Sequence, residues 1–207
     1  DKNCDGRHCE VEFVKSLAED LLRRDFTINA MAIDKDGNLI DLSGGTEDIE
    51  NKNIRTVGDE KKRFAEDKLR IMRTIRFSTV LNFEISEDIV YVIKNDFIGS
   101  LTTESTHNFI ENQSYYTIVS KPISIERIRD EFVKILLSFN RIYGIILLDD
   151  LKILNEILPE IIALKGVNQD PIHHPEKDVF VHTISALNSI SLTSTIPIIN
   201  PSIELIL

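Results

Sequence analysis

The pattern of apolar and polar residues changes character near residue 57. Before that point the segments are short and mix the two-residue period of strands with brief helical stretches. Asp36-Gly37 is a typical hairpin turn, and Ser43-Gly44-Gly45 predicts a tight turn after which Thr46 caps a short helix. The pattern therefore predicts a half-buried strand, a short helix and the two strands of a hairpin, over residues 9–14, 16–24, 26–34 and 38–42.

After residue 57 the pattern favours helices. Residues 63–81 have helical periodicity with a break at Glu66-Asp67, and Ser124 precedes an amphipathic stretch with apolar residues at 125, 128, 132, 135, 136 and 139. Two more helices are predicted over 141–150 and 151–164, with Pro159 bending or ending a turn in the second. The polar segment 95–120 is interpreted as an irregular connection. The predicted fold class is α+β, mostly α.

Composition adds few constraints. The 207 residues are 42% hydrophobic and 28% charged, which is ordinary for a globular protein, and no apolar run is long enough to span a membrane. The sequence shows no secretory leader before the fold, and Cys4 and Cys9 are interpreted as reduced thiols. We therefore expect a cytoplasmic location and no membrane partner.

Charge is distributed unevenly. The formal net charge is −10, yet residues 52–76 contain nine basic and four acidic side chains. A basic island in an acidic chain fits a local phosphate contact and does not fit a non-specific polyanion binder.

Residues 63–76 contain the most informative polar pattern. On a continuous helical wheel Arg63, Asp67, Arg70 and Arg73 share one face. A carboxylate one turn from an arginine places an acceptor beside a forked donor, which suits the Watson–Crick edge of a base. Spacing alone favours an Asp–Arg ion pair on a solvated face. Arg76 falls toward the apolar side and therefore needs a partner or a ligand.

A second polar pattern is Arg23-Arg24-Asp25 directly before an apolar segment. It fits either charges at a strand end beside a cleft or a surface ion pair.

Taken together, these segments resemble a known family. Arg23 to Ala32, residues 41–57, Arg63 to Phe77 and Glu126 to Phe132 are similar, in that order, to motifs of bacterial class II nucleotidyltransferases, the family of tRNA CCA-adding enzymes and poly(A) polymerases. The resemblance implies the C-terminal part of a nucleotidyltransferase head over 1–57, a helical neck over 58–140 and the start of a helical body over 141–207.

The resemblance also implies functional roles. Arg24 would contact the phosphates of the incoming nucleotide, Asp67 and Arg70 would pair with the base edge of CTP or ATP, and Arg73 and Arg76 would complete the nucleotide pocket. The implied activity is CCA addition to tRNA with Mg²⁺ as cofactor. The family's metal-binding aspartates are expected upstream of Asp1, so we predict no catalytic residue in this chain and no transferase activity for it alone.

No metal site is predicted within the chain. Asp34-Lys35-Asp36 is interpreted as turn chemistry. Residues 173–183 resemble the opening of an HD-type phosphohydrolase body, in which His182 would be the first metal ligand. The expected downstream His-Asp doublet is absent from the sequence, so the histidines are interpreted as part of a loop that starts a helix.

Two other functions compete with CCA addition. Poly(A) polymerase shares the same motifs. A non-catalytic RNA- or nucleotide-binding remnant would keep the neck without the catalytic head.

Overall fold

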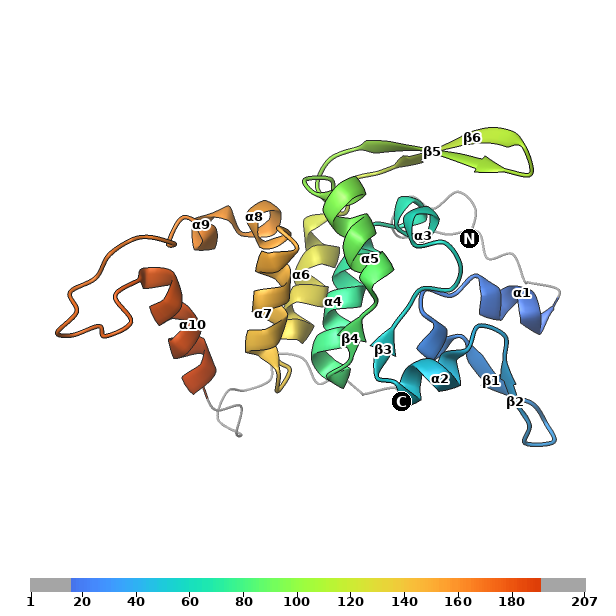
Figure 1. Cartoon of the computed structure of the whole chain (residues 1–207), viewed down its shortest axis with the longest axis horizontal. Coiled ribbons are helices and arrows are strands. Elements are labelled where there is room, and N and C mark those ends of the chain that lie inside the picture. The colour runs from blue at the N-terminus through green and yellow to red at the C-terminus, as the bar shows by residue number, and fades with distance from the viewer. Residues whose placement is uncertain (1–15, 191–207) are drawn as a thin grey trace.

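The computed structural model describes residues 16–190 as an elongated arrangement in which the N-terminal elements, a central group of helices and α10 follow one another along the long axis (Figure 1). The predicted fold class is confirmed, because about half of the chain is helical and the sheets are small two-stranded ones. The strand predicted over 9–14 and both cysteines lie outside the described residues. No helix in the described part has the length and apolarity needed to cross a membrane.

The N-terminal unit is built from short elements, as predicted. They are helix α1 (Leu17–Leu22), the 3₁₀ helix η1 (Thr27–Asn29), strands β1 (Met31–Ile33) and β2 (Leu39–Asp41), helix α2 (Gly45–Glu50) and strand β3 (Asn53–Ile54). Strands β1 and β2 form an antiparallel hairpin around the predicted turn. The prediction of a strand over all of 26–34 is wrong for its first half. There, the side chains of Asp25 and Asn29 both accept from the N–H of Phe26, and such local bonds compete with strand pairing.

The start of α2 is stabilised by Asp41, which corrects the predicted cap at Thr46. The Asp41 carboxylate accepts four backbone N–H groups, at 3.2 Å from Ser43 and 2.9 Å from each of Gly44, Gly45 and Thr46. These bonds, that of Thr46 foremost, hold the pKa of Asp41 well below its usual range. Gly44 has a φ of +78°, which a residue without a Cβ adopts at little cost.

The central part of the molecule is a group of helices. It contains α3 (Glu60–Glu66), α4 (Leu69–Leu81), strand β4 (Glu84–Ile85), α5 (Glu87–Val92), the π-helix η2 (Ile93–Phe97), α6 (Ile125–Leu136) and α7 (Arg141–Asp150). Helices α4, α6 and α7 pack on one another around the main hydrophobic core, which includes Met72, Ile75, Ile128 and Ile135. Gly144 lets α7 approach closely, because an added Cβ would lie 2.5 Å from the Ile135 side chain. The helix predicted over 141–150 is confirmed, and the one predicted after Ser124 is confirmed over Ile125–Leu136, although its apolar pattern continues to residue 139.

Beyond α7 the helix predicted over 151–164 is interrupted. It consists of α8 (Leu154–Ile157) and α9 (Pro159–Ile162), with Pro159 in the first turn of α9, where its missing N–H costs nothing. Helix α10 (Val179–Ser189) follows a long loop and packs against α7.

The segment 95–120 is not an irregular connection. Most of it is an antiparallel hairpin, β5 (Ser105–Glu111) and β6 (Ser114–Ser120), which packs on α3 and extends past it (Figure 1). Asn112 and Gln113 both have positive φ, as a two-residue hairpin turn requires. The many Ser, Thr and Asn residues lie along a ribbon that is exposed on one face, and they obscured the alternation of His107 and Phe109 with polar neighbours.

Lys68 anchors the base of this hairpin, although sequence reasoning gave it no role. The residue is 2% exposed. Its Nζ donates to the carbonyls of Ser100 at 2.6 Å, Ser120 at 3.3 Å and Thr103. Burial lowers the pKa of this amine. The residue before α4 is thereby tied to both ends of the β5–β6 hairpin.

We expect Lys68→Met to lower the free energy of unfolding by at least about 2 kcal/mol, since each buried polar group left unpaired costs roughly 1–3 kcal/mol. Urea denaturation measures the change. The control is Lys121→Met, an exposed lysine beside the same hairpin, which should stay within about 0.5 kcal/mol of the parent. Equal stabilities of the two variants would contradict the anchoring role of Lys68.

Candidate nucleotide-binding site

The predicted break between α3 and α4 is confirmed and defines the candidate site. Helix α3 ends at Glu66 and α4 begins at Leu69, with the backbone of Asp67 extended between them. Oδ1 of Asp67 accepts the N–H of Leu69 at 3.0 Å and so starts the second helix. The interpretation that Arg63, Asp67, Arg70 and Arg73 share one face of a continuous helix is therefore wrong. We call Arg63, Glu66, Asp67 and Arg70 the α3–α4 joint.

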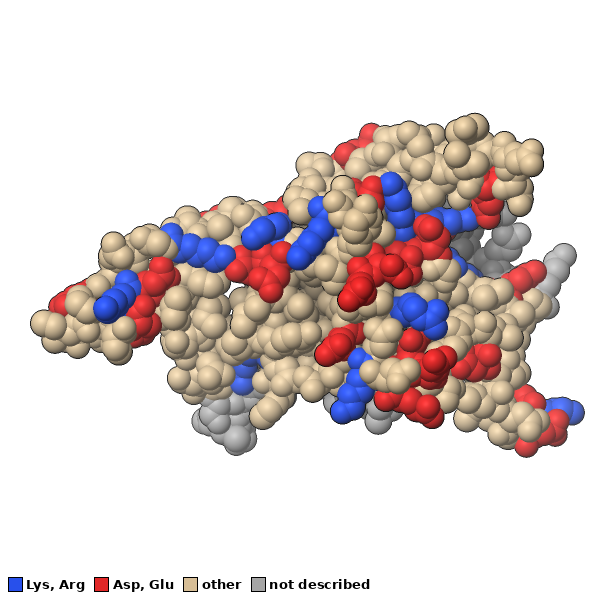
Figure 2. Space-filling view, viewed as in Figure 1, with Lys and Arg blue, Asp and Glu red and all other residues tan. Residues whose placement is uncertain are grey.

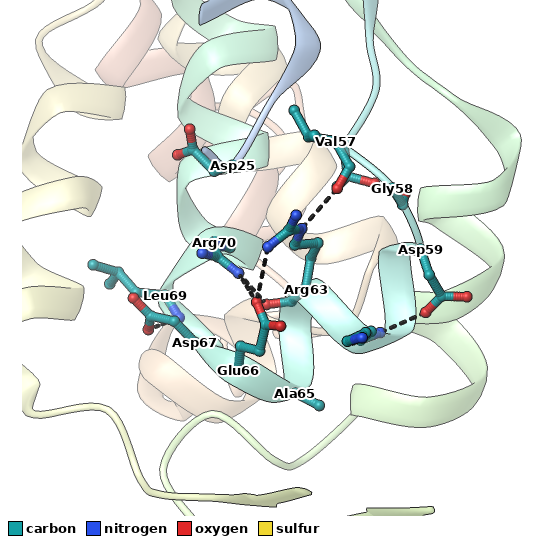
Figure 3. Close-up of polar contacts among 12 residues, drawn as sticks. Asp25, Val57, Gly58, Asp59, Arg63, Ala65, Glu66, Asp67, Leu69 and Arg70 are labelled. Atoms are coloured by element: carbon teal, nitrogen blue, oxygen red, sulfur yellow. Dashed lines mark hydrogen bonds and ion pairs between the residues drawn. The ribbon is translucent and has the colours of Figure 1, made fainter. Parts of the chain in front are cut away.

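Glu66 organises the arginines of this joint (Figure 3). Its Oε2 accepts from Nη1 of Arg63 at 3.2 Å and from Nη1 of Arg70 at 2.9 Å. Arg63 also donates through Nε to the carbonyl of Val57 at 2.6 Å, and Arg70 donates to the carbonyl of Arg63 at 2.8 Å. The carboxylate one turn from Arg70 that pairs with it is thus Glu66, and the predicted Asp67–Arg70 ion pair does not form. Among the described residues the side-chain hydrogen bonds of Arg70 both run through Nη1, so Nε and Nη2 are left for a ligand.

Asp67 points to a different helix. Its Oδ2 accepts from Nη2 of Arg127, on α6, at 3.0 Å. The side chain of Asp67 is 36% exposed and that of Arg127 is 50% exposed, so solvent reaches both. A ligand at the joint can therefore reach an accepting carboxylate, which lies beside the guanidinium of Arg70, whose side chain is 17% exposed.

Arg73 lies one turn along α4 and connects the joint to the N-terminal unit. Its Nε donates to Oδ2 of Asp25 at 2.6 Å, and the Asp25 side chain is only 11% exposed. Oδ1 of Asp25 accepts from Nδ2 of Asn29 at 2.9 Å, and the carbonyl of Asn29 accepts from Arg24 at 2.8 Å. Arg24 and Arg73 are thus linked through two intervening residues, Asn29 and Asp25, and Arg24 keeps 44% of its side chain exposed.

Arg76 pairs with a buried acid on α6. Its Nε donates to Oε2 of Glu131 on α6, and the two side chains are 16% and 6% exposed. Its guanidinium also lies 4.0 Å from the centre of the Phe77 ring. The partner that the sequence required for Arg76 is Glu131. The described contacts of Arg76 include none of Arg24, Asp67 and Arg70, but Arg76 shares the Phe77 ring with Arg73, whose guanidinium lies 5.5 Å from the centre of that ring.

Comparison with known proteins identifies the same regions. The model described as "Poly A polymerase head domain" matches residues 1–55, and the model described as "Probable RNA and SrmB- binding site of polymerase A" matches residues 120–164. The chain belongs to the nucleotidyltransferase family of CCA-adding enzymes and poly(A) polymerases. The resemblance expected from the motifs is confirmed.

Individual relatives of the family are all partial matches. The CCA-adding enzyme of Enterococcus faecalis is 45% identical over 136 residues, covering 66% of this chain and 29% of the relative. The CCA-adding enzyme of Bacillus pumilus is 55% identical over 87 residues, covering 42% of this chain and 22% of the relative. The crystal structure of the Bacillus stearothermophilus CCA-adding enzyme in complex with CTP is 38% identical, with a TM-score of 0.57, and the match covers 71% of this chain and 32% of that one. The chain thus spans less than a third of the length of the curated relatives it matches first.

The described residues do not fit the two-Mg²⁺ site that the family implies. Oδ1 of Asp34 accepts from the backbone N–H of Asp36 and of Asn38, at 2.8 Å each, and its Oδ2 accepts from the Asn38 side chain at 2.9 Å. This carboxylate therefore fastens a turn. Within residues 16–190 one group of three potential ligands converges, and two of its members are imidazoles, which suit Mg²⁺ poorly.

Three contacts at the site were missed by sequence reasoning: Asp67 with Arg127, Arg73 with Asp25, and Arg76 with Glu131. Their members lie 60, 48 and 55 positions apart, so no local spacing reveals them. The only sequence signal for any of these contacts was the resemblance of residues 126–132 to a neck helix. It singled out the segment that contains Arg127 and Glu131 but did not indicate which residues they contact.

Proposed function

We propose that the protein to which this chain belongs adds C and A to the 3′ end of tRNA, using CTP and ATP. The observation that carries the proposal is the α3–α4 joint, where an exposed carboxylate and the free nitrogens of Arg70 lie together in a chain closely similar to CCA-adding enzymes. The proposed roles are base reading by Asp67 and Arg70 and phosphate contact by Arg24. We also propose that Arg73 and Arg76 border the pocket.

The chemistry of the joint favours C and A over U and G. Cytosine and adenine each present an exocyclic amino donor beside an accepting ring nitrogen, whereas uracil and guanine present a carbonyl beside a ring N–H. A carboxylate accepts and a guanidinium donates, so the pair Asp67 and Arg70 matches the first pattern and opposes the second. Such a protein template would select the incoming nucleotide in place of a nucleic-acid template.

The remaining parts of the proposal follow from the family. Mg²⁺ would activate the reaction in the parent protein, held by residues other than those described. We propose a nucleotidyltransferase head over 1–57, a helical neck over 58–140 and the start of a helical body over 141–207. We also propose a cytoplasmic location, where tRNA is processed. A relative from Thermotoga maritima, 26% identical with a TM-score of 0.52, was solved in complex with tRNA_CCA, which supports tRNA as the partner.

Positive charge in the chain suits a small number of phosphate contacts. On the face drawn in Figure 2, Lys and Arg lie in scattered groups among Asp and Glu, and the β5–β6 hairpin bears mostly uncharged side chains. Strands β5 and β6 themselves contain no Lys or Arg. We therefore place the phosphate contacts near the joint and not on the hairpin.

Nucleotide binding to the 207-residue chain tests the base-reading role. Isothermal titration with each of the four ribonucleoside triphosphates should give tighter binding of CTP and ATP than of UTP and GTP. Equal binding of all four would contradict it. The chain alone is expected to incorporate no labelled CMP or AMP into tRNA, because its described residues do not fit the metal site, and incorporation would overturn that prediction.

Activity of the parent protein tests the reaction itself. On a tRNA that lacks its terminal CCA, the expected product is longer by C, C and A and then stops. A long A tail would indicate a poly(A) polymerase, and triphosphate binding without any product would indicate a non-catalytic binding module.

A further inference from the structure

The loop before α10 is held in a fixed path by Asp178. Oδ1 of Asp178 accepts the N–H of Val181 at 3.0 Å and caps the helix, while Oδ2 accepts the N–H of Gly166 at 2.6 Å. The backbone N–H of Gln169 also donates to the carbonyl of Lys177 at 2.9 Å. The loop therefore folds back onto the first turn of α10.

This path brings three metal-ligating side chains together. One ligand atom from each of His174, Glu176 and His182 lies within 4.8 Å of the other two, and all three residues are partly buried. Nδ1 of His182 is hydrogen-bonded to Oε1 of Glu176. The His174 and His182 rings meet edge to face, with centroids 4.8 Å apart.

His174 has an unsatisfied ring nitrogen. Its Nδ1 is buried and has no hydrogen-bond partner among the described residues. A buried polar atom left unpaired is costly, so such atoms in folded proteins normally face a partner or an ion. Its neighbour His173 has a side chain that is 76% exposed, with Asp170 3.8 Å away, and belongs to the surface.

We propose that His174, Glu176 and His182 bind a divalent transition metal ion, with zinc as the best-suited member. Two imidazoles and one carboxylate form a donor set that zinc accepts, and three protein ligands leave the fourth position for water. Zinc–nitrogen distances of about 2.0–2.1 Å place the ligand atoms of a tetrahedral site roughly 3.3 Å apart, so the three side chains must adjust their spacing on binding. The site is distinct from the one that the resemblance to HD-type proteins implies, since it shares only His182 with that set and lies entirely within residues 174–182.

The test is titration of the 207-residue chain with Zn²⁺ against a chromophoric chelator. It is carried out in a background in which Cys4 and Cys9 are replaced by serine, because thiolates outside the described residues also bind zinc. We expect one equivalent to bind. Loss of a residue that only hydrogen-bonds to a metal ligand typically weakens metal binding by about 10–100-fold, and loss of a ligand itself should cost at least as much. We therefore expect each of three variants to weaken binding at least tenfold: His174→Gln, Glu176→Gln and His182→Gln. His173→Gln is the matched control and should bind as the background protein does.

A second measurement keeps the result independent of folding defects. Each variant is checked by far-ultraviolet circular dichroism and thermal unfolding without metal, and zinc should raise the melting temperature of the background protein and of His173→Gln but not of His182→Gln. Co²⁺ substitution should give visible absorption bands without thiolate charge transfer. Absence of a one-equivalent site, or a site that survives loss of both His174 and His182 in a folded double variant, would overturn the proposal.

Discussion

Asp67→Asn is expected to weaken binding of CTP and ATP by about 10–100-fold, because a hydrogen bond to a charged group contributes roughly 1.5–3 kcal/mol. The carboxylate accepts from the exocyclic amino group of the base, and an amide presents one acceptor and one donor in its place. Binding of UTP and GTP should change little, so the preference for CTP and ATP should narrow. Isothermal titration with the four triphosphates measures both effects. This prediction rests on the proposed base-reading role.

The variant separates base reading from a structural effect. Asp67 also starts α4 by accepting the N–H of Leu69, and asparagine performs that capping role nearly as well as aspartate. We therefore expect the free energy of unfolding to fall by less than about 1 kcal/mol. Asp130→Asn is the control, since Asp130 is an exposed acid on α6 that pairs with its neighbour Arg129. A preference for CTP and ATP that is the same in Asp67→Asn and the parent chain would contradict the role of Asp67.

Several of the helices were predictable because their signals are local, whereas α5 and η2 were not predicted. The break at Glu66-Asp67, the amphipathic α6 and the bounds of α7 can all be recognised within a window of a dozen residues. The β5–β6 hairpin was not recognised. Its pairing runs between residues up to 15 positions apart, and its turn, Asn112-Gln113, lacks the usual glycine. The Asp41 cap was missed for a similar reason, since its carboxylate reaches forward over five residues.

The candidate site was predictable as a set of positions and not as a set of contacts. The motifs identified Arg24, Asp67, Arg70 and Arg73, and the fold gathers them near the junction of the N-terminal unit with α4. Which acid pairs with which arginine depends on the packing of α6 and of the turn before η1 against α4, and a single sequence does not specify that packing. Arg76 illustrates the difference, because spacing showed that it needed a partner and only the fold identifies Glu131.

Breaking the Arg76–Glu131 pair is expected to have the largest effect on stability. The Glu131 side chain is 6% exposed and that of Arg76 is 16% exposed, at the contact between α4 and α6 in the main core. Removing one partner of such a pair leaves a charge buried without compensation, which costs about 3–5 kcal/mol. We therefore expect Glu131→Leu to lower the free energy of unfolding by that amount in urea denaturation. Arg76→Met should lower it by less, because Glu131 also accepts from Nζ of Lys134 at 3.0 Å and keeps that partner.

The double variant, Arg76→Met with Glu131→Leu, distinguishes a structural Arg76 from one that binds nucleotide. Replacing both members of a buried ion pair by apolar residues of similar volume is often neutral for stability, so the double variant should recover most of the loss. If Arg76 acts only through the contact of α4 with α6, the double variant should then bind CTP as the parent chain does. A folded double variant that no longer binds CTP would instead place Arg76 in the nucleotide pocket, as the family resemblance implies. Failure of the double variant to regain stability would contradict the view that Arg76 and Glu131 act as a pair.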